Sequence, residues 1–144
     1  MTSVFATLLT AVNIFKLYMQ VKIDTREKFH AISIQESTLA ANMTEQLEQC
    51  LLPILQKDVK NVVLILKDIA EVDDAAAECL VRIQQAFYED SASFVICELT
   101  PAVEKSLEDN GLLELMNVTP TESEAWDIVH LEEVERDMLN DSDY

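Results

Sequence analysis

The feature that most constrains the fold is a pair of short segments, residues 62–66 and 93–99, in which apolar side chains run almost without interruption. Strands of this kind are buried on both faces of a sheet, because alternation with polar residues marks a face exposed to water. The segment between them places apolar residues at helical spacing, namely Ala76, Leu80, Ile83 and Phe87. A helix that joins two such strands predicts a parallel pair with a right-handed crossover, and therefore an α/β fold.

The residues that precede this unit predict a hairpin and a helix. Residues 20–34 hold two alternating apolar runs on either side of a polar turn, as in a pair of antiparallel strands. Asn42 is a plausible N-cap, and Glu45 three residues later would complete a capping box. Pro53 falls inside the apolar pattern that follows, where it is expected to kink the helix or begin a new turn.

The residues that follow predict two further helices and an edge strand. Thr100 is expected to cap a helix that ends at Asn110-Gly111, where glycine permits a left-handed backbone. Residues 112–118 hold a turn and a last strand, and a capping box of Thr121 and Glu124 begins the final helix. The whole pattern predicts a single domain with a mixed, mostly parallel sheet and about four helices.

The domain is expected to span residues 19–139. The chain has 144 residues, of which 49% are hydrophobic, enough for one core. Residues 1–18 are predicted to lie outside the domain, either because the start site is misassigned or because they form a peripheral membrane anchor. They are too short and too polar to span a bilayer, so stable membrane insertion is not expected. The acidic tail, residues 140–144, is expected to fray.

The net charge of −17 excludes some partners. A surface this negative repels phosphate backbones and anionic lipid headgroups, so we expect no nucleic acid partner. The charge either keeps the protein soluble or complements a basic patch on a protein partner. The cysteines Cys50, Cys79 and Cys97 are widely spaced among apolar neighbours, which is typical of reduced core thiols and of a cytoplasmic protein.

No residue pattern indicates catalysis, a cofactor or a metal. The acidic residues between Asp68 and Glu78 lack the spacing and the turn glycine of a calcium loop, and helix capping with a solvated helix face explains them. A chain with a single glycine has few means of cradling a nucleotide with backbone amides. Trp126 is expected to pack in the core.

Three segments carry a further signal, namely residues 61–66 (NVVLIL), residues 72–77 (VDDAAA), and residues 97–103 (CELTPAV) followed by Gly111-Leu112. Together, and in register, they resemble the STAS domain, the fold of bacterial anti-sigma factor antagonists and of the cytosolic tails of sulfate transporters. The first segment looks like the central strand of that family, the second occupies the place of its Asp-Ser-Ser-Gly-Leu turn, and the third is similar to its strand leading into a Ser-Pro-x-Val helix. The resemblance runs from residue 62 to 129.

The resemblance implies a regulatory switch that this chain has altered. In typical antagonists an anti-sigma factor kinase phosphorylates a serine at the start of the second helix, and the phosphate breaks the complex because its charge is costly to bury in an interface. The equivalent position here is Asp74, and no hydroxyl lies between Asp73 and Ala77. Asp74 is therefore either a fixed negative charge or part of a scaffold without phosphoregulation. Capping of the helix by Asp73 or Asp74 is sufficient to explain the residue.

We therefore expect a non-catalytic domain of the anti-sigma factor antagonist type in a bacterial cytoplasm, with a kinase-like protein as its partner. The expected partner-binding residues are Glu71, Asp73, Asp74, Ala75 and Glu78. The alternative is an accessory STAS subunit of a membrane transport or signalling complex, which an apolar patch on the last helix would favour. An enzyme or nucleotide-binding protein is a third class, which a saturable thermal shift with nucleotide would support.

Overall fold

The computed structural model describes residues 19–142. Residues 1–18 and 143–144 lie outside that range, and so do the two interpretations of the N-terminal segment. The last helix runs to Ser142, three residues past the position where the sequence placed the end of the domain.

The two apolar segments form the centre of the main sheet. Strands β4 (Val62–Ile65) and β6 (Phe94–Cys97) are buried at every residue and pair in parallel, from Val62 opposite Phe94 to Ile65 opposite Cys97. Their burial on both faces is the property that the lack of polar alternation predicted.

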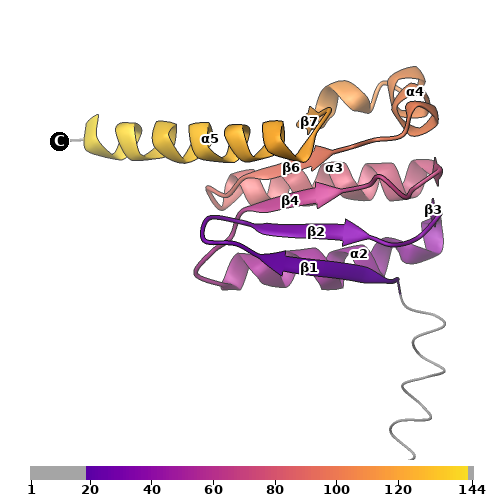
Figure 1. Ribbon diagram of the computed structural model, residues 1–144, viewed down its shortest axis with the longest axis horizontal. Helices are drawn as coiled ribbons and strands as arrows, with labels where there is room; N and C mark the ends of the chain where they lie inside the picture. Colours follow the sequence, from indigo (N-terminus) through magenta and orange to yellow (C-terminus); the bar gives the residue numbers. More distant parts are fainter. Residues whose placement is uncertain (1–18, 143–144) are drawn as a thin grey trace, which may run out of the picture.

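The main sheet has five strands in the order β1-β2-β4-β6-β7 (Figure 1). The predicted hairpin consists of β1 (Val21–Thr25) and β2 (His30–Ile34), which pair antiparallel. Strand β2 also pairs in parallel with β4, and the edge strand β7 (Val118–Thr119) pairs in parallel with β6. The sheet is therefore mixed and mostly parallel, as predicted.

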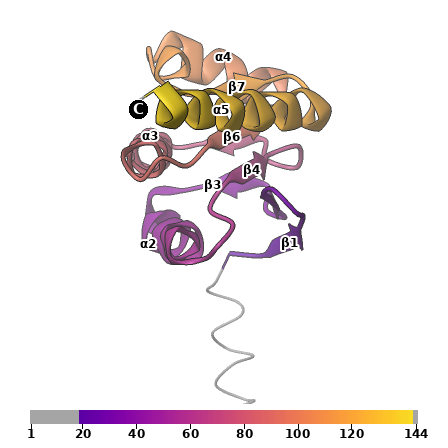
Figure 2. The same ribbon diagram turned by 90° about the vertical axis from the view of Figure 1, so that its left-hand side faces the viewer.

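The helices cover the two faces of the sheet unequally. Each parallel strand lies on the same side of the one before it, so right-handed crossovers put α2 (Thr44–Leu51), α3 (Asp74–Glu89) and α4 (Pro101–Asp109) on one face. Helix α5 (Glu122–Ser142) packs on the other face, against β4 and β6 (Figure 2). Two hydrophobic clusters result, a large one beneath α2, α3 and α4 and a small one beneath α5.

The ends of α4 agree with the sequence. Thr100 caps it by accepting a hydrogen bond from the Val103 amide, and Gly111 takes the left-handed conformation just past its end (φ 72°). Short 3-10 turns join the other elements, namely η1 (Ala41–Met43), η2 (Leu52–Gln56) and η3 (Leu113–Leu115). Pro53 lies in η2, so it begins a new turn after α2 rather than continuing that helix.

Three local expectations differ from the structure. Asn42 caps no helix, because it lies inside η1 and α2 begins at Thr44 without a side-chain cap. A second sheet, not predicted, joins β3 (Thr38–Leu39) to β5 (Glu71–Val72), two strands too short for a periodic pattern. Trp126 is not a core residue: it is 38% exposed and lies between the Phe29 ring and the Arg26 guanidinium.

The cysteines are free thiols, and their surroundings suppress ionisation. Burial raises the pKa of the Cys97 thiol to about 12, and the nearby carboxylates of Glu98 and Glu122 act in the same direction. Burial also raises the pKa of Cys79 and of Cys50, with Glu48 adding to the effect at Cys79. Because the thiolate is the reactive species, these thiols should be slow to alkylate in the folded protein.

We predict that iodoacetamide at pH 8 labels Cys50 first and leaves Cys97 almost unmodified in the native protein. A thiol with a pKa of about 12 is ionised in only about one molecule in ten thousand at that pH. Mass spectrometry of peptides after timed labelling gives the three rates, and the same protein in urea provides the reference. Equal rates for Cys97 in the two states would contradict the buried position.

Candidate protein-docking surface

The acidic segment predicted from the sequence lies where the chain leaves the carboxyl end of β4 and enters α3. Ile69, within this segment, anchors it to the core, because its side chain is fully buried in the large cluster. The Thr100 hydroxyl donates to the Ile69 carbonyl over 3.0 Å, which ties the segment to the start of α4. Strand β5 then pairs with β3, so the segment is anchored on two sides while its outer side chains remain free to face solvent.

The five predicted contact residues are all exposed, and they gather around the N-terminus of α3. They are Glu71, Asp73, Asp74, Ala75 and Glu78. The inward side of the same helix begins at once with buried Ala76 and Ala77. This division follows from helical periodicity, since the acidic residues occupy the face turned away from the sheet. No other part of the described chain covers them, so we name these five residues the acidic docking surface.

Asp73 stands at the N-cap position of α3, but its carboxylate makes no capping hydrogen bond to that helix. It accepts instead from the Ala41 amide over 3.1 Å. The prediction that the Asp73 carboxylate caps α3 with a hydrogen bond is therefore wrong. The physical reason is the pairing of β3 with β5, which is extended by a hydrogen bond from the Asp73 amide to the Leu39 carbonyl (2.8 Å). This pairing brings the Ala41 amide, at the start of η1, close to the Asp73 carboxylate.

Asp74 is also engaged by a distant element rather than by the first turn of its own helix. Its Oδ1 accepts a hydrogen bond from Asn110 Nδ2 over 2.8 Å, at the C-terminal end of α4. A side-chain cap by Asp74 is therefore not observed. The carboxylate still lies in the first turn of α3, where the helix dipole favours a negative charge. Because the donor is a neutral amide, the contact leaves that charge in place.

This surface can bind basic side chains. Exposed carboxylates form charge-assisted hydrogen bonds with lysine or arginine side chains. Ala75 beside them is small enough to let a partner approach closely. Within residues 19–142, no group of three or more histidine, cysteine, aspartate or glutamate side chains is placed to hold a metal ion.

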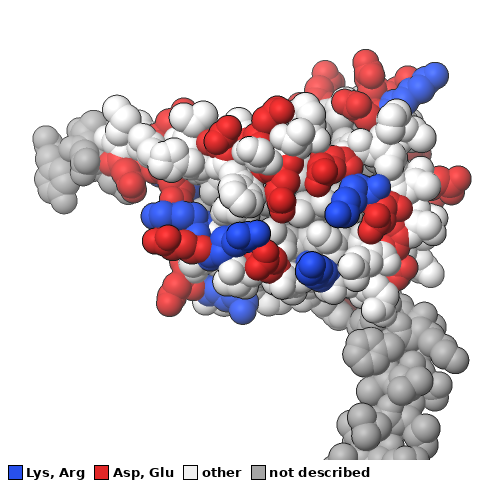
Figure 3. Space-filling view, in the orientation of Figure 1, with Lys and Arg blue, Asp and Glu red and all other residues white. Residues whose placement is uncertain are grey.

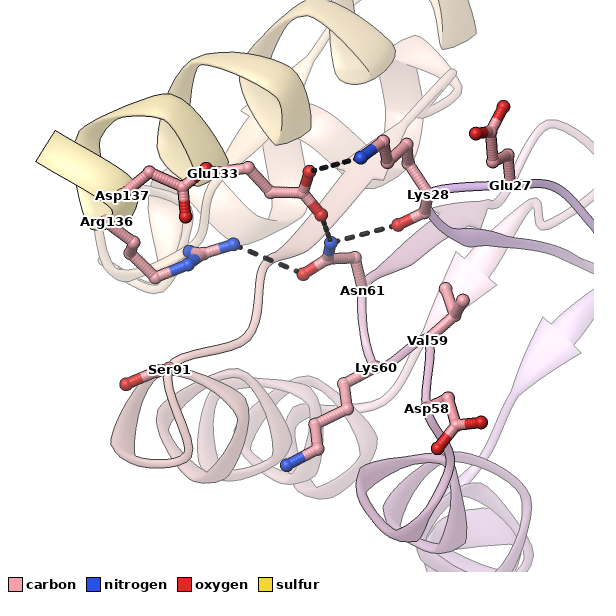
Figure 4. Close-up of a pocket in the computed structure, with 10 residues that line it drawn as sticks. All are labelled: Glu27, Lys28, Asp58, Val59, Lys60, Asn61, Ser91, Glu133, Arg136 and Asp137. Atoms are coloured by element: carbon pink, nitrogen blue, oxygen red, sulfur yellow. Dashed lines mark hydrogen bonds and ion pairs between the residues drawn. The ribbon is translucent and has the colours of Figure 1, made fainter. Parts of the chain in front are cut away.

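A polar cleft of about 400 Å³ lies at the opposite end of the sheet (Figure 4). Its lining comes from the β1–β2 turn, the segment before β4, the residues just after α3 and the second half of α5. The lining residues are Glu27, Lys28, Asp58, Val59, Lys60, Asn61, Ser91, Glu133, Arg136 and Asp137. Sequence reasoning did not single out this cleft. The signal in the sequence was slight, a lone asparagine immediately before an apolar strand.

Asn61 is the centre of the cleft, and its contacts are structural. Its side-chain amide donates to the Lys28 carbonyl (2.9 Å) and to Glu133 Oε1 (2.6 Å). Its oxygen accepts from the Ser93 amide (2.8 Å) and from Arg136 Nη2 (3.4 Å). These four bonds join the hairpin, both central strands and α5, so the cleft is a clamp that fixes α5 on the sheet.

With the fold and the surface in place, comparison with known families is informative. The sequence model of the STAS domain family matches residues 20–125, which is most of the chain. The chain belongs to the STAS domain family. No curated protein sequence is significantly similar to it.

Solved structures agree with this fold. An anti-sigma factor antagonist from Mycobacterium paratuberculosis superposes with a TM-score of 0.67 at 14% identity, over 78% of this chain and 94% of that one. RsbS from Moorella thermoacetica, in a serine-to-glutamate variant, gives 0.64 at 24% identity over 81% and 98% of the two chains. The murine anion transporter Slc26a9 gives 0.63 at 11% identity, over 90% of this chain and 25% of the transporter.

The comparisons thus describe a STAS domain with anti-sigma factor antagonists among its structural neighbours. At these identities the likeness concerns the fold. Among the described residues, no helix is both long and apolar enough to cross a membrane.

We predict that Asp73→Ala lowers the free energy of unfolding by about 0.5–1.5 kcal/mol, because the Ala41 amide loses its partner. Asp68→Ala in the preceding loop is the matched control, because it also removes an exposed carboxylate, and it should change the value by less than about 0.5 kcal/mol. Urea denaturation followed by circular dichroism measures both. Equal effects of the two variants would remove the assigned role of Asp73.

Proposed function

We propose that this STAS domain is a non-catalytic, protein-binding regulatory module of the anti-sigma factor antagonist type. Its partner docks on the acidic docking surface. The observation that carries the proposal is the exposure of all five residues of that surface around one helix N-terminus. In the family that this sequence resembles, the same turn meets the anti-sigma factor.

The charge of the surface supports a protein with basic side chains as the partner. Glu71, Asp73, Asp74 and Glu78 present four carboxylates to solvent. Complementary charges steer association and fix the orientation of the complex, even where each rim contact contributes little affinity. The lining of the surface includes the small Ala75, which allows a partner backbone to come close.

The binding is proposed to be constitutive. The position that the resemblance assigns to the phosphorylated serine is Asp74, and the turn between Asp73 and Ala77 has no hydroxyl that a kinase could modify. An aspartate carries less charge and fewer acceptor oxygens than a phosphate, so it is an incomplete mimic. Its hydrogen bond to Asn110 gives it a structural role in addition to any contact with a partner. We therefore infer a domain without phosphoregulation at this turn.

The partner is proposed to be a kinase-like anti-sigma factor in a bacterial cytoplasm. Affinity purification from the native organism, with the full chain as bait, identifies it. Recovery of a sigma-regulatory kinase supports the proposal.

We predict that Asp74→Arg weakens binding of the purified partner at least tenfold in a calorimetric titration. Charge reversal replaces an attractive contact by a repulsive one at the centre of the surface. Asp74→Asn separates charge from structure, because the amide oxygen can still accept from Asn110. It should therefore bind with an intermediate affinity and unfold only slightly below the wild-type temperature, because it loses the favourable interaction of the charge with the helix dipole.

Glu89→Arg is the matched control, since it reverses an exposed charge at the far end of the same helix. Its affinity should equal that of the wild type. If Asp74→Arg bound as tightly as Glu89→Arg, the acidic docking surface would not be the binding site.

A second candidate function is an accessory STAS subunit of a membrane transport or signalling complex. The observation that favours it is a group of exposed apolar side chains on α5, which includes Leu131, Val134 and Met138. The likeness of the fold to part of an anion transporter is compatible with it. Purification of a membrane permease in place of a kinase would support this second function.

A further inference from the structure

Helix α5 is apolar on two opposite sides. Its inner side is buried on the sheet through Ala125 and Val129, which pack in the small cluster with residues of β4 and β6. Its outer side carries Leu131, Val134 and Met138, which are 54%, 40% and 65% exposed. Because successive residues turn by about 100°, these three lie within one narrow sector, roughly opposite Ala125 and Val129. We call Leu131, Val134 and Met138 the outer stripe.

The orientation of the outer stripe is fixed by the cleft at the end of the sheet. Glu133 and Arg136 lie on the inner side of the helix and bond to Asn61 (Figure 4). Arg136 also donates to the Ser93 hydroxyl. Rotation of the helix would break those bonds. The stripe therefore faces away from the domain, and the second half of α5 projects past the end of the strands (Figure 1).

The spacing of the outer stripe is that of a helix-packing seam. Residues 131, 134 and 138 are separated by three and four positions, the repeat that lines one helix against another. Single exposed apolar residues are normal on a protein surface. Here, however, the exposed apolar residues form a continuous row, and the opposite side of the helix is already buried. This pattern is typical of a helix that is covered on both sides.

The charges around the outer stripe select its occupant. Asp127 and Glu135 are exposed beside it, and the only lysine or arginine of α5 is Arg136, which is turned inward. In Figure 3 the helix surface is white and red, while most visible basic side chains lie below it over the hairpin. A second copy of this chain, with its net charge of −17, would bring carboxylates against carboxylates. A basic helix would pair with them instead.

We propose that the outer stripe of α5 is a second docking site, which binds a basic amphipathic helix of another protein. The site lies at the end of the sheet opposite the acidic docking surface. The two surfaces are separate, so one domain can join two partners at once. This proposal does not depend on the identity of the partner at the acidic docking surface.

The test uses a synthetic helical peptide with leucine at heptad positions a and d and lysine beside them. A scrambled peptide of the same composition, which lacks an apolar face, controls for attraction between opposite charges alone. We expect the amphipathic peptide to bind the full chain at least tenfold more tightly than the scrambled one in calorimetry. Amide NMR shifts should then concentrate on residues 127–139.

Two variants locate the site. The double variant Leu131→Ser/Met138→Ser removes exposed apolar surface without touching the core, and it should weaken peptide binding at least tenfold while the melting temperature stays unchanged. Leu115→Ser, which removes an equally exposed leucine outside α5, is the matched control and should bind like the wild type. The variant Asp74→Arg should also bind the peptide normally, which separates this site from the acidic docking surface.

Three results would overturn the proposal. One is equal binding of the amphipathic and scrambled peptides. Another is full binding by the double variant. The third is concentration-dependent dimerisation of the chain in analytical ultracentrifugation that the double variant abolishes, since a second copy would then be the occupant.

Discussion

The fold depends on keeping the two central parallel strands, β4 and β6, out of water on both faces. Three helices supply the cover on one face, because every crossover between parallel strands turns the same way and advances in the same direction. Among residues 19–142, the other face receives only α5, the element that follows the last strand. The unequal cover explains why one hydrophobic cluster is large and the other small.

The two surfaces of interest lie at opposite ends of the sheet. At the carboxyl ends of the parallel strands, Ile69 of the turn into α3 is buried in the core, whereas the carboxylates of the turn are exposed. At the other end, Asn61 holds α5 in one rotational setting through Glu133 and Arg136. A buried asparagine with every hydrogen bond satisfied is well suited to this task, because any other arrangement leaves polar groups unpaired.

On the proposed function, Asp74 has lost a regulatory role and keeps a structural one. The family that the sequence resembles uses a hydroxyl at this position to switch binding off by phosphorylation. Here a carboxylate connects the start of α3 to the end of α4 through Asn110. A permanent charge cannot be removed by a phosphatase or added by a kinase. We propose that such a domain holds one binding state, so that control comes from the abundance of the protein or from its partner.

The sequence by itself determined the order of the main-sheet strands and the α-helices, the parallel core and the exposure of the acidic turn. These properties follow from local periodicity and from turn residues such as Gly111. Both signals can be read without knowledge of distant contacts. Only the tertiary structure decided the partners of the charged and polar side chains. Asp73 meets Ala41 and Asp74 meets Asn110, residues 32 and 36 positions away. The outward setting of Leu131 and Met138 was decided in the same way. Which side of a helix faces the core depends on the element it packs against, and that contact is not encoded in the spacing of the helix alone.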